Sequence, residues 1–501
     1  MTPDVIVSYA IYGIVGALAL FGMLLGLIRG VMRSLVRLIT VSASFGAAFA
    51  VTVALKDSML SIFDGKTLSD LLTPLGIAVG EGDWVGAITM DTVKTLLTLP
   101  AGLVVLPFLF VALFLIINFF MLIIHKILCG IMGYTRANNN EMTRLLGAAV
   151  GAVQGAIIAL VILIPVSGTI NTFASAVNYV AEKYPDRNNT QALVSTYDQF
   201  FKASEDNVVL DILAPVSDAL YPSFTVFEID GEQIDVRECV NGAAVVLVNL
   251  GDIAATDWKE LTDTDKAAID SMVDVITENR YYATVVSGIL SALGEFNEND
   301  SLFDLPEPLG SFVDCIFDIM KTSNRDNISG DLDTLIEVLY LISDSGTLRT
   351  LIDGGNALES FIQKDSEGVL LYNKFNAVFN ANPRFSGITT AINDLAFEML
   401  LQNNNSDLPV EEVIEDVKTG INDVLSIEKE SYETPEEYRE AVTESLETTL
   451  KSNDIELTDD QMEKITDYVI NDMEDVEEVT DAEIAEFIAK YYEIYAQMQG
   501  Q

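Results

Sequence analysis

The stretch of sequence that decides the fold reads RLLGAAVGAVQG, from Arg144 to Gly155. Its glycines, Gly147, Gly151 and Gly155, recur every four residues and therefore share one face of a helix. The apolar run continues to residue 168, which gives it the length of about 20 residues that a bilayer core requires. Small residues at this spacing let helix backbones approach closely in lipid. The stretch therefore predicts a membrane-spanning helix that packs tightly against a neighbour.

Three further apolar segments upstream have the length of a membrane span, namely residues 5–28, 31–55 and 100–124. Together with residues 145–168 they make four predicted spans. The first is predicted to be retained, because its amino end carries Asp4 and no Lys or Arg, unlike a signal peptide. It repeats the four-residue spacing at Gly22, Gly26 and Gly30. Both packing among the helices of one chain and dimerisation are open interpretations of these glycine faces.

The short loops between the spans set the expected orientation. The first turn carries Arg29, Arg33 and Arg37 and no acid, and the loop before the fourth span carries three basic residues against one acid. The loop of residues 56–99 carries three lysines against six acids. Because Lys and Arg favour the cytoplasmic side, both basic loops are predicted inside and both termini outside. The expected location is therefore the cell membrane, with a multi-pass topology and an extracytoplasmic carboxyl-terminal part.

Polar side chains inside the spans are candidates for function. Asn118 and Gln154 lie roughly 9–14 Å from the inner ends of spans three and four, at 1.5 Å per residue. We expect them to be able to hydrogen-bond each other, with Arg33 and Arg37 nearby. Neutral amides also serve as packing contacts between helices. The full set of candidates for membrane packing or function is Arg29, Gly30, Arg33, Arg37, Asn118, Arg144, Gly147, Gly151, Gln154 and Gly155.

Three features of the membrane third follow a known pattern. Leu27-Ile28-Arg29-Gly30 followed by Arg33 forms a basic turn after the first span, and the four spans enclose a long outer loop. The glycine-spaced entry to the fourth span, residues 144–155, is the third feature. In these features residues 5–168 resemble the colicin V production protein family. The chain departs from the family pattern at Thr143, where the family usually has Asp, and at Gln154, where it usually has Arg.

The resemblance implies an integral membrane protein linked to envelope function and secretion, with no settled biochemical activity. Some relatives carry an extracytoplasmic serine protease after the fourth span. This chain has no histidine after residue 125 and no Gly-Asp-Ser-Gly run. The resemblance therefore agrees with the expected layout and does not imply an enzyme here.

The rest of the chain is strongly acidic. Residues 169–501 contain 19 Lys/Arg and 67 Asp/Glu, whereas residues 1–168 contain 9 and 8. The excess of acidic residues argues against nucleic acid as a partner, because phosphate binding needs clustered Lys/Arg. The negative charge instead attracts cations and basic partners. His125 is the only histidine, so catalysis by Ser-His-Asp or Cys-His is excluded from the acidic part. We predict no catalytic residue, cofactor or metal site, and leave open whether Cys239 and Cys315 pair.

The acidic part is predicted to be mainly helical. One short β-hairpin is expected near residues 224–236, where Asp230-Gly231 separates alternating apolar residues. Residues 409–501 show four apolar stripes at helical spacing. Three of these helices begin with capping-box patterns, at Thr434…Glu437, Thr458…Gln461 and Thr480…Glu483. The fold class is therefore all-α, with a four-span domain at 1–168, an acidic, mainly helical domain at 169–408 and an acidic four-helix module at 409–501.

The leading functional hypothesis is a non-enzymatic scaffold or interaction protein of the cell envelope, linked to secretion or envelope homeostasis. It would present the acidic helical part outside the cytoplasm. The alternative is a component of a small-molecule or peptide transporter that oligomerises through its glycine-rich spans. The expected partners are membrane lipid, an envelope protein and a further copy of the chain, and nucleic acid is not among them.

Overall fold

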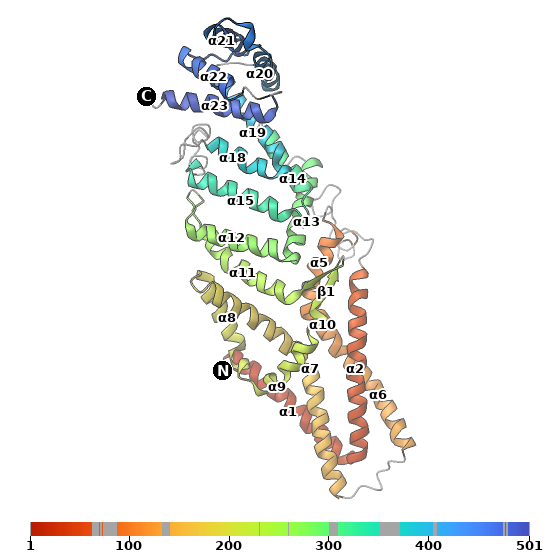
Figure 1. Cartoon of the computed structure of the whole chain (residues 1–501). Coiled ribbons are helices and arrows are strands. Elements are labelled where there is room, and N and C mark those ends of the chain that lie inside the picture. The colour runs from red at the N-terminus through yellow and green to blue at the C-terminus, as the bar shows by residue number, and fades with distance from the viewer. Residues whose placement is uncertain are drawn as a thin grey trace. The chain divides into compact units, whose positions relative to one another are not determined.

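In the residues that it describes, the computed structural model is all-α with one two-stranded hairpin (Figure 1). By contacts the chain forms two compact units. The first comprises residues 1–81, 88–255 and 267–289, and the second comprises mainly residues 290–501 with the segment 256–266. The structure describes the chain apart from residues 1, 63–69, 71, 72, 74–87, 133–140, 230, 259, 300–308, 348, 350–370, 404–407, 474, 475, 477, 478, 500 and 501.

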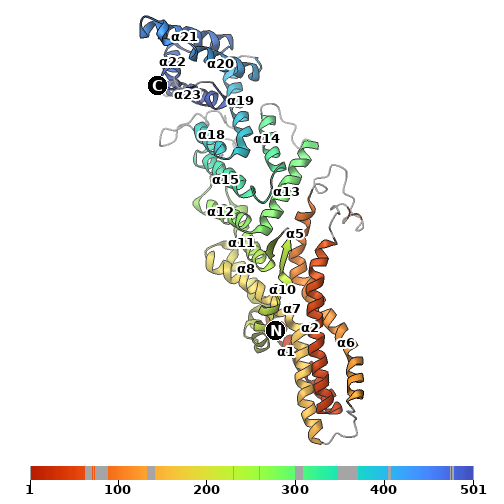
Figure 2. The ribbon, with the colours of Figure 1, turned by 45° about the vertical axis from the view of Figure 1, so that its right-hand side comes forward.

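The first unit is built on long apolar helices that run side by side (Figure 2). Its elements are α1 (Pro3–Arg29), α2 (Val31–Ser61), α5 (Met90–Pro100), the π-helical turn η2 (Ala101–Val105), α6 (Leu106–Ile131), α7 (Glu141–Lys183), α8 (Asn188–Glu205), α9 (Val208–Leu220), α10 (Pro222–Thr225), β1 (Val226–Ile229), β2 (Glu232–Asp235) and α11 (Val236–Ala255). Helix α7 packs against α1, and α2 packs against both α6 and α7. The bundle thus brings the first and the fourth predicted spans together.

Five helical segments of the described chain are long and apolar enough to cross a membrane. Four contain the predicted spans: α1, α2, the continuous run Met90–Ile131 and α7. The fifth is α11, whose hydropathy is the lowest of the five. The sequence pattern did not predict it, because the apolar run 240–250 alone is too short to span. In the structure α11 packs against α7 and α8 and buries Val240, Val245 and Val248 in the core of the first unit.

A π-helical turn interrupts the third long helix between Pro100 and Leu106. Proline has no N–H and its ring displaces the preceding carbonyl, and π-turns accommodate such local breaks. The small residue Gly102 lies in this turn, where an added Cβ would come within 3.0 Å of the Phe227 and Val236 side chains. The hairpin therefore packs directly on this turn.

The predicted hairpin is present, and it packs on the membrane helices. Strands β1 and β2 pair antiparallel, with Phe227 opposite Ile234. Lys56 of α2 donates a hydrogen bond to the Val226 carbonyl at 2.7 Å. The Phe224 ring just before β1 lies 5.5 Å, centre to centre, from the ring of Phe110 in α6. An isolated hairpin is marginally stable in water, so these contacts explain why this one is ordered.

Residues 169–255 and 267–289 consequently share a core with the apolar helices. That core runs from Ile11 of α1 to Val285 and includes the hairpin and α11. Residue 168, where the composition changes, lies inside the continuous helix α7. The compositional division of the sequence therefore does not coincide with the division into compact units, the second of which begins its main segment at residue 290.

The second unit is a succession of helices that pack both on neighbours in sequence and on helices further along the chain. Helices α12 (Asp263–Glu278) and α13 (Arg280–Asn299) cross the boundary between the units. The remaining elements are α14 (Leu309–Lys321), α15 (Ile328–Asp344), α18 (Leu371–Ala381), the 3-10 turn η4 (Pro383–Phe385), α19 (Ser386–Asn403), α20 (Val410–Leu425), the 3-10 turn η5 (Lys429–Ser431), α21 (Pro435–Ser452), α22 (Asp459–Asn471) and α23 (Asp481–Gln499).

The four stripes predicted beyond residue 409 are buried in this unit. The capping boxes at Thr434 and Thr458 are confirmed, with both reciprocal hydrogen bonds present. At Thr480 the backbone N–H donates to the Glu483 carboxylate at 2.9 Å. The stripes belong to one core that extends from Ile319 to Ile494. Residues 409–501 thus share this core with α14, α18 and α19.

One buried ion pair joins three elements of the second unit. Asp331 of α15 is 3% exposed, and its carboxylate oxygens accept from the Arg384 Nε at 2.9 and 3.1 Å. The Arg384 Nη2 also donates to the carbonyl of Ile319 in α14 at 2.7 Å. A charge pair that satisfies several hydrogen bonds in this way holds its elements in a fixed arrangement.

Candidate functional site

The predicted glycine faces of the first and fourth spans meet each other within one chain. A Cβ added to Gly151 of α7 would lie 2.2 Å from the carbonyl oxygen of Gly22 in α1. A Cβ on Gly26 would lie 2.0 Å from the carbonyl oxygen of Gly147, and one on Gly155 would lie 2.1 Å from that of Leu18. The two backbones are therefore in direct contact. The order of the pairs shows that α1 and α7 run antiparallel.

Gly30 closes the turn between α1 and α2. Its φ of 78° lies in the region that side chains rarely adopt, and this lets α2 begin immediately after α1 ends at Arg29. A Cβ on Gly147 would lie 2.8 Å from the Gly30 Cα. The turn is thereby held against the beginning of α7, so the basic residues that flank it are fixed relative to the bundle.

The central polar group of the bundle is Arg37 of α2, which is 3% exposed. Its Nη2 donates to the Asn118 side-chain oxygen of α6 at 2.6 Å and to the Asn118 carbonyl at 3.3 Å. Its Nη1 donates to the Thr40 hydroxyl at 3.2 Å. The guanidinium therefore links α2 to α6 inside the bundle. With about 1.5 Å per residue, it lies roughly 9 Å from the start of α2.

Within the described part of the chain, no carboxylate forms an ion pair with Arg37, whose hydrogen-bond partners are all neutral. The sequence has no Asp or Glu between Asp4 and Asp57, between Asp91 and Glu141, or between Glu141 and Glu182. A buried cation whose hydrogen-bond partners are all neutral is energetically expensive. In a membrane helix, such a residue marks a candidate functional position.

Other basic groups surround this position. Arg29 is the last residue of α1, and Arg33 lies in the first turn of α2. His125 is buried, and Cys129, one turn further along α6, lies 3.8 Å from its Nε2. The bundle end near the α1–α2 turn therefore concentrates positive charge. This arrangement would attract an anionic group, such as a lipid phosphate or a carboxylate, to that end.

The structure confirms that Arg37 lies beside Asn118, but it does not join the two predicted amides to each other. Asn118 binds Arg37, whereas Gln154 of α7 is 5% exposed and forms no hydrogen bond with Asn118 in the described part of the chain. Arg144 is exposed at the beginning of α7, and Arg29 and Arg33 are half-buried. Sequence reasoning missed Thr40, although its position three residues after Arg37 on one helix face was the available signal.

The described residues include no group of three or more His, Cys, Asp or Glu side chains arranged to hold a metal ion. Cys129, Cys239 and Cys315 are free thiols. Comparisons of the chain with known proteins found no matching protein family, no matching curated protein and no matching solved structure.

Proposed function

We propose that this chain is an integral membrane protein of the cell envelope that presents an acidic helical domain outside the cytoplasm as a scaffold for a partner protein. Its membrane part would belong with the colicin V production protein family, and its role would concern secretion or envelope homeostasis. The observation that carries the proposal is the pairing of an apolar bundle, packed through its own glycine faces, with residues 290–501, which contain 12 Lys/Arg against 47 Asp/Glu.

The charge of this second part supports an exported location and a protein partner. Its net charge of −35 would be repelled by the anionic inner leaflet, which attracts basic segments. The arginines at the α1–α2 turn would hold that turn on the cytoplasmic side. Four crossings, through α1, α2, α5–α6 and α7, then lead the chain to the outer side. In this proposal α11 stays within the extracytoplasmic part, packed on α7 and α8.

The glycine faces also help to decide between the scaffold hypothesis and the transporter hypothesis. Oligomerisation through these glycines would need them to be accessible, yet Gly22, Gly26, Gly147, Gly151 and Gly155 are buried between α1 and α7. One observation favours the alternative, namely the buried Arg37 guanidinium, which is suited to attract an anionic solute into the bundle. We rank the scaffold first, because the bundle is already packed through the faces that an oligomeric path would use.

Capture of partners in cells tests this function. A photoreactive amino acid placed at Glu444 of α21 should crosslink to a specific envelope protein, because that exposed helix face belongs to the presented domain. The same group at Met142, an exposed residue near the start of α7, serves as the matched control and should not capture that protein. The captured species is identified by mass spectrometry. Equal capture from both positions, or none from any exposed position of the second unit, contradicts the scaffold.

An Arg37→Met variant in the same experiment distinguishes the two functions. The scaffold predicts unchanged capture from Glu444, since Arg37 lies inside the bundle and, among the described residues, forms side-chain hydrogen bonds only with Thr40 and Asn118. The transporter predicts that the variant accumulates normally but loses the cellular phenotype of the parent. Loss of the phenotype together with unchanged capture would therefore favour the transporter.

A further inference from the structure

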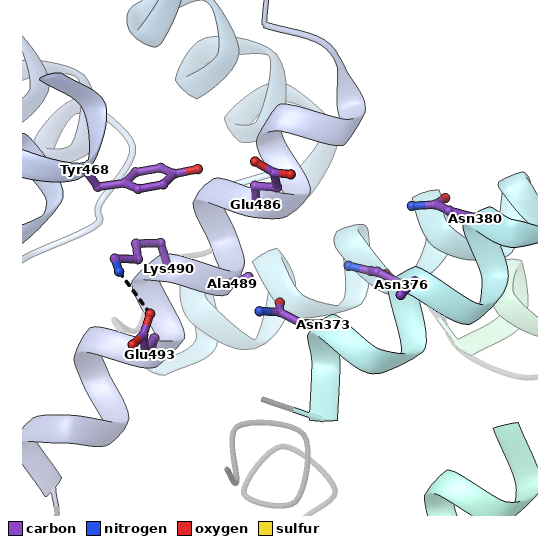
Figure 3. A pocket seen from close by; sticks show the side chains of 9 residues that line it. Asn373, Asn376, Asn380, Tyr468, Glu486, Ala489, Lys490 and Glu493 are labelled. Atoms are coloured by element: carbon purple, nitrogen blue, oxygen red, sulfur yellow. Dashed lines mark hydrogen bonds and ion pairs between the residues drawn. The ribbon is translucent and has the colours of Figure 1, made fainter. Parts of the chain in front are cut away.

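A polar groove lies in the second unit, between α18 and α23 (Figure 3). It encloses about 450 Å³, which falls within the range of roughly 300–1,000 Å³ typical of ligand sites. One wall is α18, which contributes Asn373, Asn376 and Asn380 at spacings of three and four residues. Residues at this spacing form a row along one helix face. In Figure 3 the three amide groups point toward the side on which α23 lies.

The middle asparagine of this row has an unused acceptor. Asn376 is 8% exposed, and its Oδ1 is buried without a hydrogen-bond partner. A buried polar atom without a partner costs free energy, and such atoms are uncommon in folded proteins. The neighbouring Asn380 uses its Oδ1 to accept from the Thr389 hydroxyl at 3.1 Å, which leaves its amide N–H groups as donors. Together with the exposed amide of Asn373, which carries both an acceptor and donors, the row provides both hydrogen-bonding polarities.

The opposite wall carries charge. Lys490 of α23 donates to the Glu493 carboxylate at 3.0 Å and lies 5.9 Å from the centre of the Tyr468 ring. Because Glu493 pairs with Lys490, the carboxylate of Glu486 gives the groove a net negative charge. Burial raises the pKa of Tyr468 to about 12, so its hydroxyl keeps its proton at neutral pH and is a further donor. The groove therefore favours a ligand with both hydrogen-bonding polarities and positive charge.

We propose that this groove binds an extended peptide segment through its main chain and prefers segments with basic side chains. The proposal rests on the function proposed above, because it names the ligand class that the presented domain binds. A carboxamide carries one acceptor and two donors, which match the N–H and C=O of a peptide unit. An extended peptide has both groups at every residue, whereas a helical peptide has used them internally.

The length of the asparagine row fits this ligand. Seven residues of helix separate Asn373 from Asn380, which corresponds to roughly 10.5 Å at 1.5 Å per residue. An extended chain advances about 3.3 Å per residue, so the row spans about three residues of peptide. Positive side chains on that segment would meet Glu486 in the groove and, at longer range, the acidic surface of residues 290–501.

Peptide binding to the full-length protein in lipid nanodiscs tests the proposal. The probe is a fluorescein-labelled hexapeptide of alternating Lys and Ala with blocked ends, followed by fluorescence anisotropy. Removal of two amides in an Asn373→Ala/Asn380→Ala double variant should weaken binding about tenfold, as expected for a few lost hydrogen bonds. Both side chains are exposed, so the variant should fold. Asn471→Ala, an exposed asparagine outside the groove on α22, is the matched control and should bind like the parent.

Competition separates main-chain recognition from charge attraction. The unlabelled Lys-Ala peptide should displace the probe, whereas the same peptide with N-methylated backbone amides should not, because it lacks N–H donors. The Glu-Ala peptide should also fail. The proposal is overturned by lack of probe binding, by equal affinity of the double variant, or by equal competition from the N-methylated peptide. Displacement by a neutral trisaccharide but not by the unlabelled peptide would instead assign the groove to sugars.

Failure of this proposal is distinguishable from failure of the proposed function. If Glu444 captures an envelope partner but the groove binds no peptide, the scaffold stands without this binding site. If the groove binds peptide but the second unit lies in the cytoplasm, the groove stands and the exported scaffold fails.

Discussion

Gly151→Ile is expected to reduce accumulation of the protein in membranes at least tenfold. The new Cβ would lie 2.2 Å from the Gly22 carbonyl oxygen and 3.0 Å from the Gly26 Cα. Both contacts are with backbone, which no change of side-chain rotamer can relieve. In lipid, helices associate through close packing and not through the hydrophobic effect. The separation of α1 and α7 is therefore not compensated, and quality control should remove the protein. Immunoblotting of membrane fractions measures the result.

A matched substitution on α1 controls for the larger side chain. Gly16 has nothing within 4 Å of an added Cβ, so Gly16→Ile should accumulate like the parent. Ile158→Ala, at a half-buried position of α7, should have a mild effect. If Gly151→Ile accumulates as well as Gly16→Ile, the contact between α1 and α7 does not determine the assembly of the bundle.

The second large effect is expected at the buried ion pair of the second unit. Arg384→Ala leaves the Asp331 carboxylate buried without its cation, and it also removes the donor to the Ile319 carbonyl. Breaking a buried pair from one side costs about 3–5 kcal/mol of unfolding free energy. For a unit of about 200 residues, a loss of about 3 kcal/mol lowers the Tm by roughly 6–12 °C. Circular dichroism of the purified protein during a thermal scan measures the shift.

An exposed arginine of the same unit provides the comparison. Arg439 pairs with Glu463 and Asp467 at the surface, where its side chain is 40% exposed. Surface pairs contribute about 0–1 kcal/mol, so Arg439→Ala should shift the Tm by no more than about 4 °C. Equal shifts for the two variants would show that the Asp331–Arg384 pair is not a structural link of this unit.

Local pattern predicted much of the fold. Spacing within a single helix was enough to predict three features, namely the glycine faces of α1 and α7, the capping threonines and the apolar stripes beyond residue 409. The pairing of the two glycine faces with each other could not be predicted in this way, because two equal faces fit an intramolecular contact and a dimer equally well. Similarly, the apolar run in α11 was too short to predict a helix of that length. The helix extends into polar residues at both ends, and these are stabilised by distant neighbours, as in the ion pair of Asp252 with Arg187.

The candidate sites were only partly predictable. Asn118 and Arg37 could be recognised as unusual residues inside apolar helices, but their bond at 2.6 Å depends on the rotation of α2 against α6. Depth along the helix, which is all that the sequence provides, suggested Gln154 as the partner of Asn118 instead. The groove beside α18 was not predicted at all. Its two walls come from Asn373 and Lys490, more than 100 positions apart. The helical spacing of its asparagines does not indicate a site unless α23 is known to face them.

The central claim is that the acidic second unit lies outside the cytoplasm, and cysteine labelling in intact cells tests it most directly. In a variant lacking the three native cysteines, single cysteines are introduced at Glu444 in α21 and at Met142 near the start of α7, both of which are exposed. A membrane-impermeant maleimide should label Glu444→Cys in intact cells and Met142→Cys only after the membrane is permeabilised. Labelling of Met142→Cys but not of Glu444→Cys in intact cells would reverse the orientation and contradict the account.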